Sequence, residues 1–461
     1  MSHPNIVFVF SDQQRYSSLG CCGNDVVNTP HLDALGADGI VFDNAFSSCP
    51  ICAPYRGQIM TGRYSHANGC IDNEYRLFPG QDTLPSVLGS AGYSTAFVGK
   101  WHLGWGPYPA EKRHGFDYMA ANNCNHKHYG MDYFENETGP FPIETWGPTG
   151  QTDTAFQFIE NHLQESAERP FCLLMSWSPP HWSSGYGDYP DRFNVYDPET
   201  VDLPPNVPKQ MEAFAREELA HYYGNVTGLD HEMGRITAFL KENGLEENTI
   251  VCYSSDHGDH LSSHGYGKPF DSWLHHSKRA SKATPYEESI HIPFLLRYPA
   301  DVLPGQRTQT MFSSVDVMPT LLGLAGVDLP GGIQGTDLSH AALGKDGPEP
   351  DSVYLQILGP GWPHRGDWVG FWRGVRTPRW VYARWFGSGK IRLFDRDNDP
   401  HEMRNLAGDP EYAEIQEQME QRLRQWIEET NDPFDTGERD PETGILLLGQ
   451  EFVHEYYTKD R

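Results

Sequence analysis

The feature that most constrains the fold is a set of short apolar runs, each followed at once by polar and ionisable residues. The runs span residues 6–10, 94–98, 171–177 and 249–253, and stretches with helical patterns separate them. This alternation is typical of parallel strands that are covered by helices on both faces of a sheet. We therefore predict an α/β fold around a central mixed, largely parallel sheet.

Helix signals fill the spaces between these runs. A threonine–proline pair predicts a helix over residues 30–39, and residues 213–243 and 313–324 carry further helical patterns. Other stretches are rich in glycine, proline and aromatic residues, and we expect them to form walls of a site. They are residues 105–150, 182–208 and 358–372.

A length of 461 residues exceeds what one hydrophobic core usually holds, so we expect two domains. The pattern breaks at Gly344–Asp351, which is rich in glycine, proline and charge. We therefore predict a catalytic domain over residues 1–350 and a smaller subdomain over residues 351–461. Hairpin strands near residues 374–382 and 390–400, with a helix within 402–429, give this subdomain α+β character.

The net charge of −28 argues against nucleic acid and anionic membranes as partners. The amino-terminal residues show no signal peptide, and no apolar run is long enough to span a membrane. The eight cysteines have no regular framework, which favours a reducing compartment. We expect a cytoplasmic protein, or a periplasmic or secreted one if a signal peptide has been removed. The sequence does not define the oligomeric state.

Polar residues gather where the predicted strands end, the edge at which open α/β sheets place their sites. Asp12 and Gln13 follow the first run, and Asp256 and His257 follow the last. A single carboxylate after a strand is often only a helix cap, but two of them with an amide oxygen suit a hard divalent cation. We predict one metal ion held by these side chains.

A cysteine leads a predicted helix in Cys52-Ala-Pro-Tyr-Arg-Gly-Gln-Ile-Met-Thr-Gly-Arg63. Pro54 favours a helix start and Gly62 a helix end, so Cys52 would face the positive end of the helix dipole. Cys49 and Cys52 also form a Cys-x-x-Cys pair, which could be a redox pair or half a zinc site. No second pair at short spacing completes a zinc site, and a buried inert thiol is the remaining simple alternative.

This segment resembles the signature of the type I sulfatases, in the alkaline phosphatase superfamily. Cys52, Pro54, Arg56 and the Met-Thr-Gly-Arg stretch at 60–63 match it, while Tyr55 stands where serine is usual. The resemblance implies an alkaline-phosphatase-like fold and a sulfate ester hydrolase. It also implies that a formylglycine-generating enzyme oxidises Cys52 to formylglycine, whose hydrate attacks sulfur and completes the metal coordination. Residues 399–406 of this chain are similar to the Asp-Pro-x-Glu-x-x-Asn-Leu segment found in that family.

The same resemblance implies roles for the basic residues. Arg56 would stabilise the formylglycine diol, and His102 would deprotonate it so that sulfate is expelled. Lys100 and Lys282 would bind the sulfate, and His181 would contact it and protonate the leaving alcohol. Lys268 and Lys278 compete with Lys282 for its role, because residues 265–281 look like an insertion. His264, nearby, is either a specificity residue or simply exposed.

Two residues depart from the family pattern, because Gln13 and His257 stand where an aspartate and an asparagine are usual. The family implies Ca²⁺, while an imidazole ligand shifts the preference toward Mn²⁺, which is the alternative. Such replacements also occur in phosphonate monoester hydrolases, so a phosphonate monoester or phosphodiester hydrolase is the alternative function. A metal-dependent binding protein that keeps the Cys52 thiol is a third reading.

The substrate is expected to be a sulfate ester of a carbohydrate or another small organic molecule. Several tryptophans lie in or near the predicted rim loops, and their faces stack well on sugar rings, although they also simply pack. These are Trp101, Trp105, Trp182, Trp273, Trp362, Trp368 and Trp372.

Overall fold

The computed structural model describes residues 3–183, 188–265, 282–359, 371–439, 441 and 446–447. Its strands are β1 (Asn5–Asp12), β2 (Ile40–Phe42), β3 (Ala45–Phe46), β4 (Ser94–Lys100), β5 (Tyr118–Asn122), β6 (Met131–Glu135), β7 (Thr138–Ile143), β8 (Phe171–Pro180), β9 (Thr249–Ser255), β10 (Phe294–Arg297), β11 (Gln306–Thr308), β12 (Phe312–Ser313), β13 (Val353–Ile357), β14 (Trp372–Arg376), β15 (Trp380–Trp385) and β16 (Ile391–Asp395). Its α-helices are α1 (Pro30–Ala37), α2 (Cys52–Thr61), α3 (Ser65–Asn68), α4 (Leu84–Ser90), α5 (Gly147–Glu165), α6 (Glu212–Glu242), α8 (Glu287–Ile290), α9 (Val317–Ala325), α10 (Ser339–Ala342) and α11 (Ala413–Glu429).

A ten-stranded sheet forms the centre, in the order β11-β2-β10-β9-β1-β8-β4-β5-β6-β7. The strands from β9 to β5 pair in parallel, whereas β10 runs antiparallel to β9 and to β2. At the other end, β6 and β7 add an antiparallel hairpin. The predicted mixed, largely parallel sheet is therefore confirmed.

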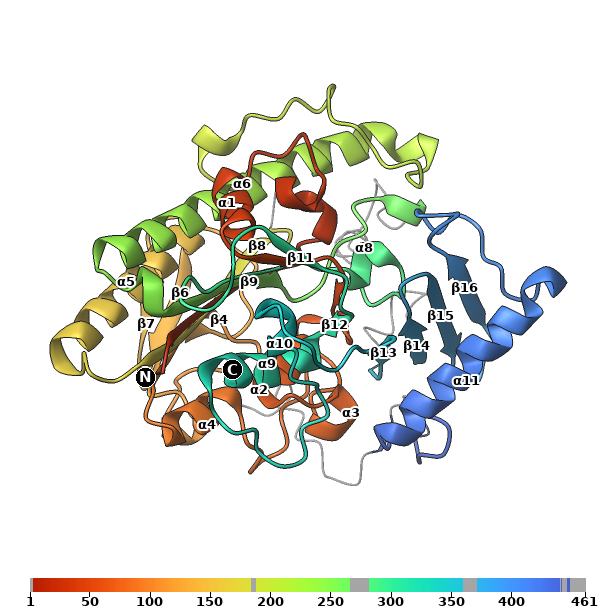
Figure 1. Cartoon of the computed structure of the whole chain (residues 1–461). Coiled ribbons are helices and arrows are strands. Elements are labelled where there is room, and N and C mark those ends of the chain that lie inside the picture. The colour runs from red at the N-terminus through yellow and green to blue at the C-terminus, as the bar shows by residue number, and fades with distance from the viewer. Residues whose placement is uncertain are drawn as a thin grey trace.

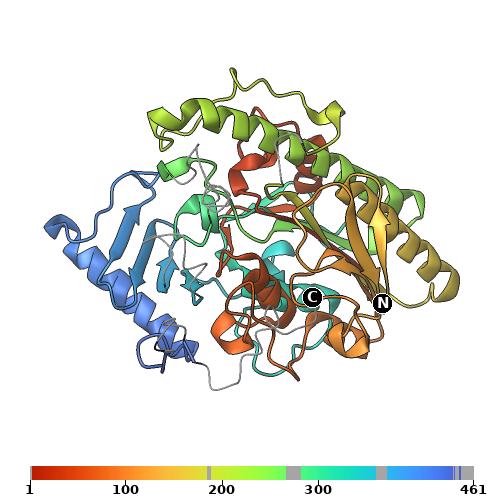
Figure 2. The same ribbon diagram turned by 180° about the vertical axis from the view of Figure 1, so that it is seen from behind.

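Helices cover both faces of this sheet. In Figure 1, α1, α5 and α6 lie on one side and α2, α4 and α9 on the other, and Figure 2 shows the same layering from behind. Along β1, Ile6, Phe8 and Phe10 pack into the α2 side, while Val7 and Val9 pack into the α6 side. A strand buried on both faces reads as a continuous apolar run, which is why the sequence pattern was informative.

A second, antiparallel sheet lies toward the carboxyl end, in the order β13-β14-β15-β16, and α11 packs on it (Figure 1). Its Trp372 indole donates a hydrogen bond to the Ala283 carbonyl at 3.1 Å. Residues of this sheet also share a core with Cys49 and Ile51, just before α2. The small sheet therefore supports the segments that carry Cys52 and Lys282, and the predicted boundary near residue 350 stays a prediction.

One stretch differs from its expected structure. Residues 105–150 read as wall loops because glycine and proline punctuate them, but the segment forms β5, β6 and β7 at the edge of the large sheet. An edge position tolerates prolines, since a proline amide has no N–H to donate to a neighbouring strand.

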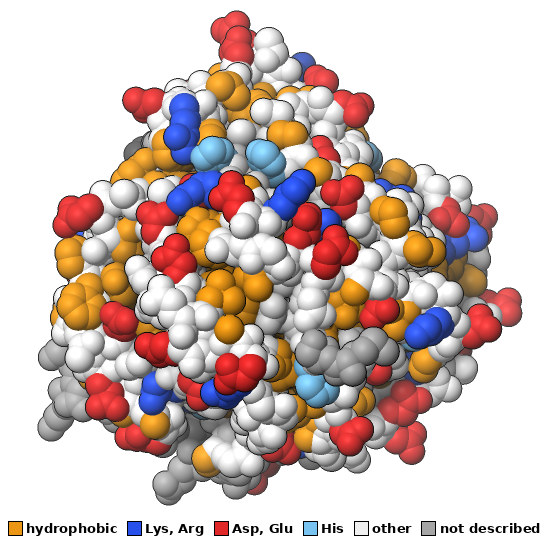
Figure 3. Space-filling model, turned by 60° about the vertical axis from the view of Figure 1, so that its left-hand side comes forward, with side chains coloured by type: hydrophobic (Ala, Val, Ile, Leu, Met, Phe, Trp, Pro, Cys, Tyr) orange, Lys and Arg blue, Asp and Glu red, His pale blue; other side chains and the backbone are white. Residues whose placement is uncertain are grey.

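The surface agrees with the acidic composition. On the face in Figure 3, acidic side chains are spread among basic ones, and the described residues there form no continuous basic patch. Among the described residues, the helices are too short or too polar to cross a bilayer.

Candidate active site

Neighbouring strands bring the predicted site residues to one edge of the sheet. β9, β1, β8 and β4 lie side by side and run parallel, so their carboxyl ends meet. Asp12 ends β1, Lys100 ends β4, His181 follows β8, and Asp256 follows β9. All four side chains are buried. Residues up to 244 positions apart in the chain thus form one site because the strand order places them together.

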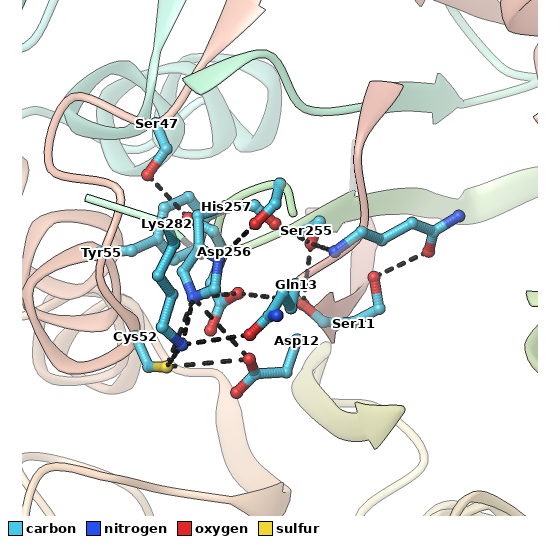
Figure 4. A network of polar contacts seen from close by, with 12 residues as sticks. Ser11, Asp12, Gln13, Ser47, Cys52, Tyr55, Ser255, Asp256, His257 and Lys282 are labelled. Carbon is cyan, nitrogen blue, oxygen red and sulfur yellow. Dashed lines mark hydrogen bonds and ion pairs between the residues drawn. The ribbon is translucent and has the colours of Figure 1, made fainter. Parts of the chain in front are cut away.

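Cys52 is the first residue of α2, and every residue of that helix is buried. Its Sγ lies 3.3 Å from His257 Nε2, 3.0 Å from Lys282 Nζ and 3.7 Å from Asp12 Oδ1 (Figure 4). The helix begins two residues before Pro54 and ends at Gly62, whose φ of 60° is the left-handed cap that glycine favours. The thiol therefore faces both a group of acceptors and a positive charge.

Asp12, Cys52, Asp256 and His257 offer ligand atoms that lie within 4.8 Å of one another. The His257 Nδ1 is 2.9 Å from the carbonyl of Gly258, which can only accept, so Nδ1 carries the proton. The lone pair of Nε2 is therefore directed at the cluster. Burial lowers the pKa of His257 to about 4, so its ring is neutral, as a metal ligand must be.

Gln13 is oriented by a residue to which the sequence analysis gave no role. Its Nε2 donates to Asp259 Oδ2 at 2.6 Å, which identifies the amide nitrogen and turns Oε1 toward Lys282 Nζ at 3.3 Å. Asp259 is 4% exposed, and Gln13 is fully buried. The sequence could have indicated Asp259 as a site residue, since it stands three residues after Asp256 in the same polar segment that follows a predicted strand.

Arg56 lies one turn after Cys52 on α2 and forms ion pairs with both carboxylates of the candidate metal site. Its Nη2 lies 3.4 Å from Asp12 Oδ2 and 3.1 Å from Asp256 Oδ2. Its Nη1 donates to Ser176 Oγ at 2.7 Å and to the backbone carbonyl of Lys100. Arg56 thus acts on the carboxylates, and within the described part of the chain it forms no hydrogen bond with Cys52.

Lys100 Nζ lies 2.5 Å from Asp12 Oδ2, and both side chains are fully buried. Burial would raise the pKa of Asp12, but the positive charge of Lys100 holds it well below its ordinary value. Burial and the negative charge of Asp12 raise the pKa of the Cys52 thiol. Just before Lys100, Gly99 has φ 116°, and a Cβ there would stand 2.1 Å from the Ser176 carbonyl, so glycine permits the close approach of β4 to β8.

His102 and His181 are buried and neutral. Burial, and then Lys100, lower the pKa of His102 well below its ordinary value, and its Nδ1 has no hydrogen-bond partner. Two residues that are two positions apart in an extended strand point to the same face. β4 ends at Lys100 and His102 has φ 57°, so this rule does not apply to Lys100 and His102. His181 Nδ1 lies 2.9 Å from the Trp182 carbonyl and must donate to it, which leaves Nε2 without the proton.

The ring of His126 stacks on that of His181, with centroids 4.1 Å apart and planes 15° from parallel. Its Nε2 lies 3.4 Å from Cys124 Sγ. Neither residue was predicted to belong to the site, since a cysteine and a histidine two positions apart in a polar loop are a weak signal.

Lys282 is 3% exposed, and its Nζ lies 3.3 Å or less from Cys52 Sγ, Gln13 Oε1 and His257 Nε2. It therefore lies among the predicted metal ligands, next to residue 52. Lys268 and Lys278, its competitors, lie outside the described residues.

The predicted aromatic rim is only partly supported. Trp101 and Trp372 are buried in hydrophobic cores, whereas Trp105 is 45% exposed. Trp273, Trp362 and Trp368 lie outside the described residues. His264 is part of a separate cavity, described below.

The donor set fits a divalent cation. Two carboxylates, an amide oxygen and an imidazole with its lone pair directed inward are hard and borderline donors. Gln13, Asp12, Asp256 and His257 would hold the ion, and residue 52 lies beside them. The dense group of acceptors already surrounds the ammonium of Lys282, which indicates a site that favours positive charge.

The family model for the sulfatases matches residues 4–327, and the model described as N-sulphoglucosamine sulphohydrolase, C-terminal, matches residues 277–429. The fold is alkaline-phosphatase-like, and the site gathers cationic side chains around a candidate nucleophile. The chain belongs to the sulfatase family and is a sulfuric ester hydrolase.

Curated relatives span nearly the whole chain. An ulvan-active sulfatase of Formosa agariphila is 34% identical over 441 residues, covering 94% of this chain and 82% of the relative. An N-acetylglucosamine-6-O-sulfatase of Bacteroides thetaiotaomicron is 26% identical, covering 97% and 89%. The solved structure of BT4656 in complex with its substrate D-glucosamine-2-N,6-O-disulfate has a TM-score of 0.83 at 24% identity, covering 94% and 100%, and this likeness concerns the fold.

Proposed function

We propose that this sulfatase hydrolyses a sulfate ester of a carbohydrate, with Cys52 converted to formylglycine as its nucleophile. The observation that carries the proposal is the position of Cys52 at the start of α2, in contact with Asp12, His257 and Lys282. The ulvan-active and N-acetylglucosamine-6-O relatives support the saccharide class. A formylglycine-generating enzyme is the partner that this maturation requires.

The Cys52 sulfur stands in for the oxygens of a hydrated aldehyde at the same position. We propose that one divalent ion binds to Asp12, Gln13, Asp256 and His257, with Ca²⁺ as first choice and Mn²⁺ as the alternative. When bound, the ion would polarise a sulfate oxygen and favour the ionised nucleophile.

The chain's own residues divide the remaining work. Lys100 and Lys282 supply fixed positive charge where a sulfate group would approach residue 52. The unpartnered Nδ1 of His102 is available to accept a proton from a hydroxyl at that residue. His181, stacked on His126, would first have to take up a proton on Nε2 before giving one to the leaving alcohol.

The test uses protein made together with a formylglycine-generating enzyme. We expect release of sulfate from sulfated saccharides and little hydrolysis of a phenylphosphonate ester, with Cys52→Ala as the inactive control. Mass spectrometry of the peptide that contains residue 52 reports the conversion. Hydrolysis of the phosphonate ester with no turnover of any sulfate would overturn the proposal.

A further inference from the structure

A second group of potential metal ligands lies at a cavity of about 530 Å³, which His264 and Glu402 line. His264, Glu288 and Glu402 offer ligand atoms within 4.8 Å of one another. They come from a short 3-10 helix at Ser263–Gly265, from α8 and from the segment after β16. The cavity therefore lies where the large and small sheets meet, and none of these residues belongs to the donor set around Cys52.

The imidazole nitrogen Nε2 of His264 lies next to an amide and a carboxylate of the same group. The amide nitrogen of Asn206 lies 2.6 Å from Glu288 Oε1 and 3.3 Å from the His401 carbonyl, two acceptors that identify it as the donor. The same nitrogen lies 3.1 Å from His264 Nε2, a third potential acceptor for its two hydrogens. Glu288 Oε2 lies 3.4 Å from His264 Nε2.

Two buried oxygens at the cavity lack hydrogen-bond partners. Glu402 is 2% exposed, and while its Oε2 accepts from the Glu287 amide at 3.0 Å, its Oε1 is unpartnered. Asn206 is 3% exposed, and its Oδ1 is also unpartnered. Both residues line the cavity. A buried acceptor without a partner is costly, so both oxygens are available to a bound water or cation.

The charges around the cavity also call for a cation. Glu287 is compensated by Arg376 at 2.6 Å and by Arg396 at 3.4 Å. Glu288 pairs with His264 at 3.4 Å, while Arg396 acts on Glu402 and Arg392 also lines the cavity, so the two carboxylates are only partly compensated. Like charges buried together need a cation or a shared proton.

We propose that His264, Glu288 and Glu402 bind a divalent transition-metal ion at this cavity, which Asn206 also lines. An imidazole with carboxylates suits Mn²⁺ or Zn²⁺ better than Ca²⁺. Because the ligands come from both sides of the junction, the ion would fasten the small sheet to the large one. Its binding would add to the stability of the folded chain.

The test isolates this site from the one near Cys52. The full chain carries Asp12→Asn and Asp256→Asn, and Mn²⁺ is titrated into the metal-free protein by calorimetry. We expect one ion to bind and to raise the melting temperature. Adding Glu402→Gln should weaken Mn²⁺ binding about tenfold or more, because removing a group that supports a metal site commonly lowers its affinity by that amount. The matched control, Glu414→Gln on the exposed face of α11, should change nothing.

No binding of Mn²⁺ to the Asp12/Asp256 double variant would overturn the proposal, as would an unchanged affinity after Glu402→Gln. If a variant fails to fold, crystals of the unaltered protein soaked in Mn²⁺ decide. An anomalous peak between His264 and Glu402 is expected, and an empty cavity beside a filled Asp12 site would refute the proposal. Both readouts are independent of sulfate ester hydrolysis.

Discussion

Replacing Arg56 by methionine tests how the site keeps two buried carboxylates close together. The guanidinium is 2% exposed and lies 3.4 Å from Asp12 and 3.1 Å from Asp256. Removing one partner of a buried ion pair costs about 3–5 kcal/mol, because the remaining charge is left without compensation. Methionine fills much of the same space, so the lost charge dominates over the lost volume.

This cost is large beside the total stability of a folded protein, which is about 5–15 kcal/mol. A divalent ion between Asp12 and Asp256 would supply part of the missing positive charge. The loss should therefore be greatest in a chelator and smaller in excess Ca²⁺, whereas a cost caused by packing would be the same in both.

The assay is equilibrium unfolding in urea, followed by tryptophan fluorescence, with and without Ca²⁺. Arg56→Lys is the matched control, since it keeps the charge while losing the planar pair of N–H donors. We expect the methionine variant to be destabilised more than the lysine variant in chelator. The reasoning is refuted if the methionine variant unfolds at the same urea concentration as the unaltered protein in chelator.

Three further outcomes follow from the site. Lys282→Ala should lower kcat on the order of a hundredfold with the fold retained by circular dichroism, since fixed charges at a reacting centre have that weight; normal kcat would remove Lys282 from the reaction. Chelation should abolish activity and Ca²⁺ or Mn²⁺ should restore it, whereas full activity in metal-free protein would contradict the donor set. Burial lowers the pKa of His260 to about 3 from its ordinary 6.5. The unfolded state then binds the extra proton, and stability should fall by about 1.4 kcal/mol per pH unit as the pH drops from 6 toward 4. In urea titrations at several pH values, His260→Gln should reduce the pH dependence of the unfolding free energy by one proton. An unchanged pH dependence would refute its assignment to His260.

Much of the fold could be read from the sequence because β1, β8 and β9 are buried on both faces. Their continuous apolar runs mark both the strands and the points where they end. The long helix predicted over residues 213–243 is α6, Glu212–Glu242. By contrast, the antiparallel direction of β10 depends on pairing with β9 and β2, partners that lie far away in the sequence. A local pattern carries no such information.

The candidate site likewise contains residues that a local sequence pattern predicts and contacts that depend on tertiary structure. Asp12, Lys100, His181 and Asp256 were predictable, because each ends or directly follows a strand and the strands are neighbours. The contacts of Lys282 were not, because they depend on how the chain returns to the sheet edge after β9. Likewise, the pairing of His264 with Glu288 and Glu402 joins three segments that only the tertiary structure brings together.

The burial of Cys52 bears on the proposed conversion of this residue to formylglycine, if that conversion takes place during synthesis. The side chain is 1% exposed, and β1, which carries Asp12 beside it, pairs with β8 and β9. That pairing cannot form until the ribosome has made the chain as far as Ser255, about 190 residues after α2 ends. At roughly 5–20 residues per second, this leaves about 10–40 s in which the cysteine is still within reach of another enzyme. Oxidation of Cys52 would therefore compete with closure of the sheet, and a slower ribosome would favour the mature enzyme.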